Sequence, residues 1–203
     1  MPRANISVPY ANFLQRVARH RLVVGRIFQI DPAIQRLVAE LVMMRLFDEF
    51  QEAISGIAQR LACGADYLDG RAPLLLTQPA SSTAGANLLF ANHGRAKHKQ
   101  PKWSKTTYIN DTTQHVLDAR DPFTRTCTAS GGAIAEMQAV RNRIAHRNPA
   151  SQKSYSTVVR RHYGARLNHV TPGLLLLSDR FKPSLLETYI ASCATIVKEC
   201  CQA

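Results

Sequence analysis

The sequence predicts an all-α fold, an antiparallel helical bundle that carries a long basic loop insertion. Residues 31–64, residues 131–146 and the residues from Pro183 onward each place apolar side chains at helical spacing. The chain has 203 residues, of which 45% are hydrophobic, so one core can be built and widespread disorder is excluded. We therefore expect a single domain over residues 1–203, with the loop insertion at about 70–110.

The first two elements are predicted to be helices. Residues 5–29 carry apolar side chains among basic ones at helical spacing. The stretch from Asp31 to Gly64 is the strongest element, because Asp31 is a good N-cap, Pro32 suits the first helical position and Gly64 suits a helix end. A helix of this length spans roughly 45 Å, which is typical of the central helix of a bundle.

The next region breaks the helical pattern. Several Pro and Gly residues interrupt residues 70–110, and the stretch from Ala80 to Gly85 is small and polar. A basic run follows between His93 and Lys105. These features predict a long loop, followed by a short helix over residues 111–120.

Further helices are predicted in the C-terminal half. The first covers residues 131–146, and the Asn148-Pro149 pair ends it. A second helix is expected over residues 151–163, and Pro183 begins a last one. Together with the two N-terminal helices, these segments give an antiparallel bundle.

The charge balance indicates a polyanionic partner. Lys and Arg total 26 against 14 acidic residues, which gives a net charge of +12. Nucleic acid is the first candidate and an anionic membrane surface the second. The chain has no 18-residue apolar stretch, no signal-peptide pattern and no CxxC pair among its five cysteines. We therefore expect a cytoplasmic protein with reduced thiols and no membrane span.

One short segment stands out for its chemistry. On a helical wheel of residues 131–146, Arg141 falls inside the apolar arc, while Asn142 and His146 lie on its edge. An arginine in an apolar stripe is costly unless it is paired. It therefore requires an acidic partner, another chain or a ligand phosphate. The long helix offers three carboxylates as partners: Asp48, Glu49 and Glu52.

The pattern Arg141-Asn142-x-x-Ala145-His146, at the end of an amphipathic helix, resembles the HEPN superfamily. The hallmark of that family is an arginine, four to six residues and then a histidine, and a polar residue, often Asn, commonly follows the arginine. The layout is also similar, with a long helix first, the motif helix later and a closing helix. The resemblance covers residues 31–64 and 130–200 and is closest to the stand-alone HEPN-like nucleases of bacteria.

The resemblance implies a metal-independent endoribonuclease that acts as a homodimer, in a toxin or an anti-phage defence system. RNA would be cut by its own 2′-hydroxyl, leaving a 2′,3′-cyclic phosphate and a 5′-hydroxyl. His146 would serve as acid or base, Arg141 would hold the phosphate, and Asn142 would fix the imidazole or bind the phosphate. One motif supplies one histidine, so a twofold partner would supply the second. An acid that orients the arginine is a further family feature, with three candidates: Glu136, Asp48 and Glu52.

Basic residues outside the motif are candidate RNA contacts. In the loop these are Lys97, Lys99, Lys102 and Lys105, with Trp103 available to stack on a base. The alternative is a solvated loop with Trp103 packed on the bundle. Arg160 and Arg161 either extend the basic track or merely solvate a helix end.

The sequence departs from the family in the two residues after the histidine and leaves other functions open. Glycine often follows the motif histidine directly, where this chain has Arg147. Toxins paired with minimal nucleotidyltransferases carry a tyrosine two residues after the histidine, where this chain has Asn148. A protein antitoxin of another kind is a candidate partner. The chain has no HExxH, CxxC pair or nucleotide-binding glycine loop, so we expect no metal site and no cofactor. The alternatives are a catalytically silent HEPN module that binds RNA or protein, and a structural helical adaptor.

Overall fold

The computed structural model describes residues 5–79, 81–91 and 102–203, and this part of the chain is helical, as predicted. The described ranges contain no β-strand, and a single isolated bridge joins Leu75 to Leu117. None of the helices in these ranges combines the length and the hydropathy that a bilayer span requires.

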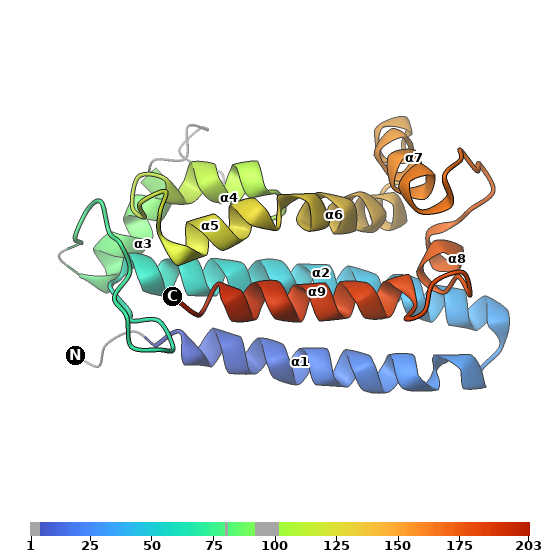
Figure 1. Cartoon of the computed structure of the whole chain (residues 1–203), viewed down its shortest axis with the longest axis horizontal. Helices are drawn as coiled ribbons and strands as arrows, with labels where there is room; N and C mark the ends of the chain where they lie inside the picture. The colour runs from blue at the N-terminus through green and yellow to red at the C-terminus, as the bar shows by residue number, and fades with distance from the viewer. Residues whose placement is uncertain (1–4, 80, 92–101) are drawn as a thin grey trace.

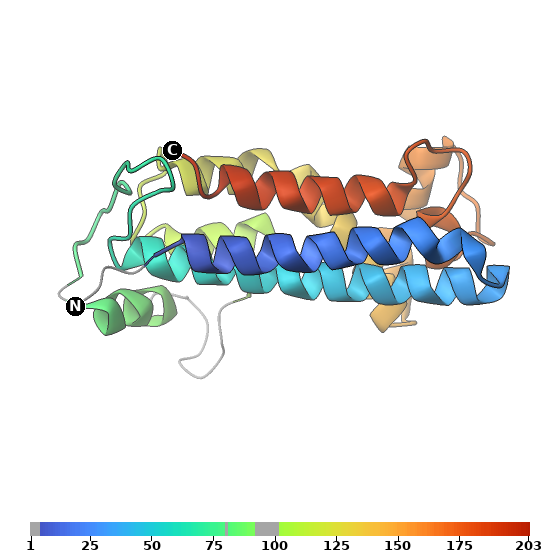
Figure 2. The same ribbon diagram turned by 90° about the horizontal axis from the view of Figure 1, so that it is seen from below.

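Four long rods form the body of the molecule (Figures 1 and 2). They are α1 (Ser7–Arg26), α2 (Pro32–Ala62), α9 (Leu185–Glu199), and a segmented rod made of α5 (Pro122–Ala129) and α6 (Gly131–Ala145). The chain runs along α1 in one direction and returns along α2 (Figure 1). Because α2 packs against α1, α6 and α9, it is the central helix of the bundle.

The ends of α2 follow the signals in the sequence. The Asp31 side chain accepts a hydrogen bond of 2.8 Å from the backbone N–H of Ala33, and Pro32 occupies the first helical position. Gly64, with φ of +76°, lies just beyond the last turn, in the left-handed region that favours glycine. Between these ends, α2 contributes the middle of the core through its buried side chains, among them Met43, Leu46, Phe47, Phe50, Ile54, Ile57 and Leu61.

The predicted loop insertion is partly helical, which corrects the sequence interpretation. Helix α3 (Ser82–Ala91) lies inside it and packs against α2. Gly85 is the point of closest approach, since a Cβ at this position would lie 2.7 Å from the carbonyl oxygen of Ala62. The glycine that suggested a loop therefore permits a close helix contact instead. Residues 92–101 lie outside the described residues.

Two short helices were misplaced or missed. Helix α4 covers Thr106–Thr113, so the short helix predicted over residues 111–120 begins earlier than expected. Helix α5 was not predicted, although Asp121-Pro122 at its start repeats the cap-and-proline signal of α2. The predicted helix over residues 131–146 is α6, and it ends at Ala145.

Helices α7 (Pro149–Tyr163) and α9 lie where the sequence predicts helices, whereas the short helix α8 (Pro172–Leu176) lies in residues 170–181, which the sequence predicts to be irregular or briefly extended. Helix α7 starts two residues before the predicted boundary, because the Asn148 side chain caps it by accepting from the N–H of Ser151. The capping box of Ser184 with Glu187 starts α9, after the cis peptide bond of Lys182-Pro183.

Candidate active site

Arg141 on α6 is half-buried and pairs with an acid, as its place in the apolar arc requires. Its Nη2 donates a hydrogen bond of 3.1 Å to Oδ1 of Asp48 on α2. The Arg141 side chain is 24% exposed and that of Asp48 is 50% exposed, so the pair lies at the edge of the core. Of the three candidate carboxylates on the long helix, Asp48 is thus the partner.

Asp48 does not exhaust the hydrogen-bonding capacity of Arg141. The Nε–H of Arg141 is buried and has no hydrogen-bond partner among the described residues. Buried donors are rarely left unpaired in native proteins, and a guanidinium carries five of them. The head group therefore retains donors for an anion that binds beside it.

A cavity of about 550 Å³ lies beside Arg141, between the start of α4, the middle of α2 and one face of α6. We call it the α4–α6 cleft. Its walls combine three cations, three carboxamides, three aromatic rings and one hydroxyl: Lys102, Lys105, Arg141, Gln51, Gln138, Asn142, Phe47, Trp103, Tyr108 and Ser104. No Asp or Glu is among the described residues that line it. The cleft is therefore both basic and rich in groups that bind planar polar ligands.

The cleft joins two sets of residues that the sequence singled out separately. Lys102, Trp103 and Lys105, predicted as RNA contacts, line the same cavity as Arg141 and Asn142. Trp103 is only 8% exposed and belongs to the hydrophobic core, which matches the alternative in which it packs on the bundle. Lys97 and Lys99 lie outside the described residues.

The two lysines that line the cleft lie close to the ring of Tyr108. The ammonium nitrogen of Lys102 lies 5.9 Å from the centre of the Tyr108 ring, and that of Lys105 lies 5.5 Å from it. Both distances are within the range of cation–π attraction. The ring therefore gathers two positive charges at one side of the cavity.

His146 lies at the corner between α6 and α7 and is exposed. Its backbone is extended, with φ of −134° and ψ of 111°, so it leaves the helix while its N–H still bonds to the carbonyl of Asn142 at 2.8 Å. The hydroxyl of Ser151 donates to the carbonyl oxygen of His146. The backbone of His146 is thus fixed from both sides, while its imidazole faces solvent. His146 does not line the α4–α6 cleft.

Glu136, one of the candidate supporting acids, joins three helices. Its carboxylate accepts a hydrogen bond of 2.6 Å from Arg161 on α7 and one of 2.9 Å from the hydroxyl of Tyr189 on α9. It also lies 2.7 Å from Nε2 of His162. Burial acts to raise the pKa of the Glu136 carboxyl, but the hydrogen bonds from His162, Tyr189 and Arg161 outweigh it and lower the pKa below its ordinary value. The sequence did not reveal this cluster, because the three partners of Glu136 all lie 25 or more positions after it in the chain.

The remaining candidate residues form contacts that do not involve Arg141. Glu52 pairs with Arg16 on α1, and the neighbouring acid Glu49 lies 2.8 Å from Nε2 of His20. Arg161 is 62% exposed and is engaged by Glu136, while Arg160 is exposed on α7. Glu52 and Arg161 therefore each form an ion pair between two helices.

Sequence inspection missed part of the cleft, although a signal was present. Gln138 is 8% exposed, and its amide Nε2 donates a 3.0 Å hydrogen bond to the hydroxyl of Ser104. Gln138 precedes Arg141 by three positions and Asn142 by four, the spacing that places residues on one helix face. A glutamine in line with the motif could therefore have been noticed, whereas Tyr108 and Gln51 required the folded chain.

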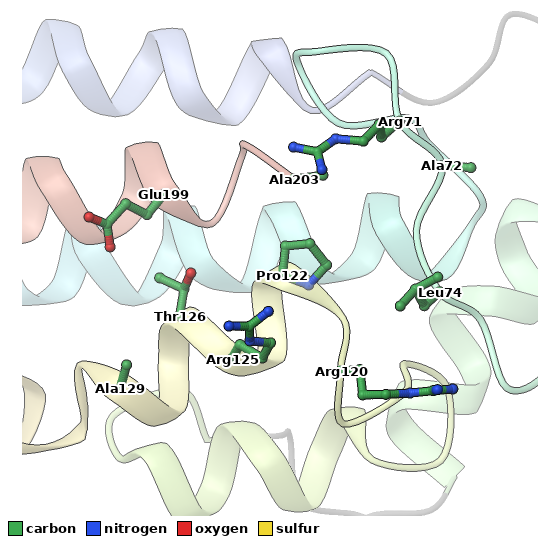
Figure 3. Close-up of a pocket in the computed structure, with 10 residues that line it drawn as sticks. All are labelled: Arg71, Ala72, Leu74, Arg120, Pro122, Arg125, Thr126, Ala129, Glu199 and Ala203. Atoms are coloured by element: carbon green, nitrogen blue, oxygen red, sulfur yellow. The ribbon is translucent and has the colours of Figure 1, made fainter.

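A second cavity, of about 560 Å³, opens where α5 begins and α9 ends (Figure 3). Arg71, Arg120 and Arg125 border it, and the Glu199 carboxylate also lies on its wall. Arg71 and Arg120 are each hydrogen-bonded to the aspartate two positions earlier in the chain. Much of the positive charge at this cavity is therefore compensated locally.

Comparison of the chain with protein-family models, with curated proteins and with solved structures finds no match. Within the described ranges, no group of three or more His, Cys, Asp or Glu side chains is placed to hold a metal ion. The candidate site is therefore defined by its own geometry: Arg141 held by Asp48, Asn142 in the cleft wall and His146 at the helix corner.

Proposed function

We propose that this protein is a metal-independent endoribonuclease that works as a homodimer. The observation that carries the proposal is that Arg141 and Asn142 line one cleft together with Lys102 and Lys105, with no Asp or Glu among its described lining residues. A guanidinium with unused donors and two ammonium groups suits a phosphodiester. The resemblance to HEPN nucleases implies the same activity, in a toxin or defence system with a protein antitoxin as a candidate partner.

The chemistry follows from the residue types. A 2′-hydroxyl attacks the adjacent phosphorus, a base accepts its proton, and an acid protonates the departing 5′-oxygen. The imidazole of His146 suits either proton transfer, because histidine titrates near neutral pH. Arg141 stabilises the charge that develops on the non-bridging oxygens, and Asn142 adds a hydrogen bond.

A homodimer is part of the proposal, since one chain provides only one motif histidine. Ile34, Leu37 and Leu41 form an exposed apolar stripe on α2, with 51%, 66% and 61% exposure. Asp48, the partner of Arg141, follows Leu41 by two helical turns on the same face. Exposed apolar surface of this kind is typical of interfaces between proteins. A second copy packed along the stripe would bring two motifs toward a shared twofold axis.

The test of the activity is an RNA-cleavage assay with EDTA present, on wild type and the His146→Ala variant. We expect wild type to cleave mixed RNA and to leave 2′,3′-cyclic phosphate and 5′-hydroxyl ends. Loss of the imidazole should lower the rate by about 10²–10⁴-fold, the usual contribution of acid–base catalysis. His169→Ala serves as the matched control, because His169 is also exposed but lies between α7 and α8. If wild type and His146→Ala are equally inert, the silent binding module becomes the better description.

The test of the dimer is the mass in solution. Wild type should show twice the chain mass of 22.5 kDa, and Leu37→Arg should shift it to the monomer because a charge on the apolar stripe opposes contact. Leu76→Arg is the control, since Leu76 is 56% exposed but lies outside α2. Light scattering coupled to size-exclusion chromatography gives the mass, and a monomeric wild type would contradict a composite site.

A further inference from the structure

We infer that the α4–α6 cleft is a nucleobase pocket that holds one unpaired ribonucleotide of the RNA beside Arg141. The inference rests on the proposed function for the identity of the substrate, but its support is the construction of the cavity itself. A volume of about 550 Å³ is within the range of small-molecule sites. It accommodates a single nucleotide rather than a duplex.

The carboxamides supply the means to recognise a base. Gln51, Gln138 and Asn142 line the cleft, and a carboxamide offers both a donor and an acceptor, as the edge of a base does. Gln138 is more than nine-tenths buried, and its hydrogen bond of 3.0 Å to Ser104 restricts the orientation of its amide. A polar group that is buried and held in this way discriminates between ligands, because a wrong partner leaves it unpaired.

The aromatic and cationic groups complete the pocket. Tyr108 is half-buried and lines the cleft, and unpaired bases stack readily on such rings. The ammonium groups of Lys102 and Lys105 lie within 6 Å of the same ring centre, at 5.9 and 5.5 Å. Both ammonium groups lie over the ring, so a base that stacks on Tyr108 would displace them and bring its phosphate close to them, with Arg141 in the same wall.

This placement gives the pocket a defined role in cleavage. RNA recognised by sequence is usually single-stranded, because its bases can leave the stack and enter a pocket. A base seated between Tyr108 and the carboxamides fixes the position of the neighbouring phosphodiester relative to Arg141. The pocket therefore selects unpaired RNA and sets which nucleotide precedes or follows the cut.

Trp103 makes this inference directly measurable. It is the only tryptophan of the chain and it lines the cleft, so its fluorescence reports on the occupied cavity. We would titrate AMP, GMP, CMP and UMP, with inorganic phosphate as a separate arm, and excite selectively at the tryptophan band. At least one nucleotide should change the fluorescence saturably at concentrations at which phosphate has no effect.

Variants of the cleft wall provide the control for specificity. Tyr108→Ala and Gln138→Ala should each weaken nucleotide binding at least tenfold, as loss of a stacking ring or a base contact does. Tyr108→Phe keeps the ring and should retain binding, which separates stacking from a loss of folding. Lys153→Ala is the matched control, because Lys153 is exposed on α7 and does not line the cleft.

The inference and the proposed function can fail separately. If wild type cleaves RNA but no nucleotide changes Trp103 fluorescence, the nucleobase pocket is wrong and the nuclease stands. If nucleotides bind but RNA is not cleaved, the pocket stands and the nuclease is wrong. If inorganic phosphate changes Trp103 fluorescence as strongly as the nucleotides do, the cleft binds anions and does not recognise a base.

Discussion

Replacing Arg141 by alanine is expected to lower kcat for RNA cleavage by about 10²–10³-fold, the usual cost of losing one group that stabilises transition-state charge. The reason is that Arg141 lies in the cleft wall with a buried Nε–H that no described residue uses. Initial rates on a defined single-stranded RNA measure the effect. The proposed function predicts that KM changes less than kcat, since the charge develops during the reaction.

Three companion variants separate chemistry from structure. Arg141→Lys retains the charge but not the planar fork, so it should recover only part of the rate. Asp48→Asn keeps an acceptor oxygen for Arg141 and should have a smaller effect than Arg141→Ala. Arg147→Ala is the control, because Arg147 is exposed and lies near the motif in the chain. If Arg141→Ala lowers the unfolding temperature but leaves the rate unchanged, Arg141 is a structural ion-pair residue and not a catalytic one.

Replacing Asp121 by alanine is expected to be the most destabilising of the single changes, with a loss of about 3–5 kcal/mol in the free energy of unfolding. Asp121 is fully buried and accepts three hydrogen bonds: 2.5 Å from the Tyr67 hydroxyl, 2.9 Å from Leu74 N–H and 3.1 Å from Phe123 N–H. Burial and the hydrogen bond to Asp121 raise the pKa of Tyr67 above its ordinary value, so the hydroxyl remains a donor. Removing the carboxylate takes the acceptor away from the Tyr67 hydroxyl and from Leu74 N–H, and it leaves Phe123 N–H with only the Tyr67 hydroxyl oxygen at 3.2 Å.

The chain offers a matched control for this prediction. Asp31 has the same role at the start of α2, before a proline, but it is exposed, and among the described residues its carboxylate accepts only from Ala33. Asp31→Ala should therefore cost only about 1 kcal/mol, the usual value of an N-cap. Urea unfolding followed by circular dichroism measures both variants. Equal losses at the two sites would show that Asp121 acts only as a helix cap.

The sequence predicted features that depend on local patterns. Asp31, Pro32 and Gly64 marked the ends of α2, because caps act through neighbouring residues. The position of Arg141 in an apolar arc predicted an acidic partner, another chain or a ligand phosphate, and Asp48 provides the acid from 93 positions away. The helical class follows from the same periodicity, whereas the family assignment and the catalytic roles stay predictions.

Other features depend on contacts between distant segments and were not visible in the sequence. Gly85 looked like a loop residue, but its missing side chain lets α3 approach the backbone at Ala62. The α4–α6 cleft requires the segment around Lys105 to fold onto Gln138. The Glu136 cluster likewise draws on three helices, so that no single segment carries its pattern.

The corner at His146 has a property that follows from Glu136. This carboxylate on α6 holds Arg161 and His162 on α7, and Tyr189 on α9. The contacts of Glu136 therefore hold α6 and α7, the two helices that meet at His146, in a fixed relative orientation. In the proposed reaction, the backbone that carries the imidazole is therefore already in place when the RNA binds. The entropic cost of ordering the backbone around His146 is then met during folding and not during each reaction cycle.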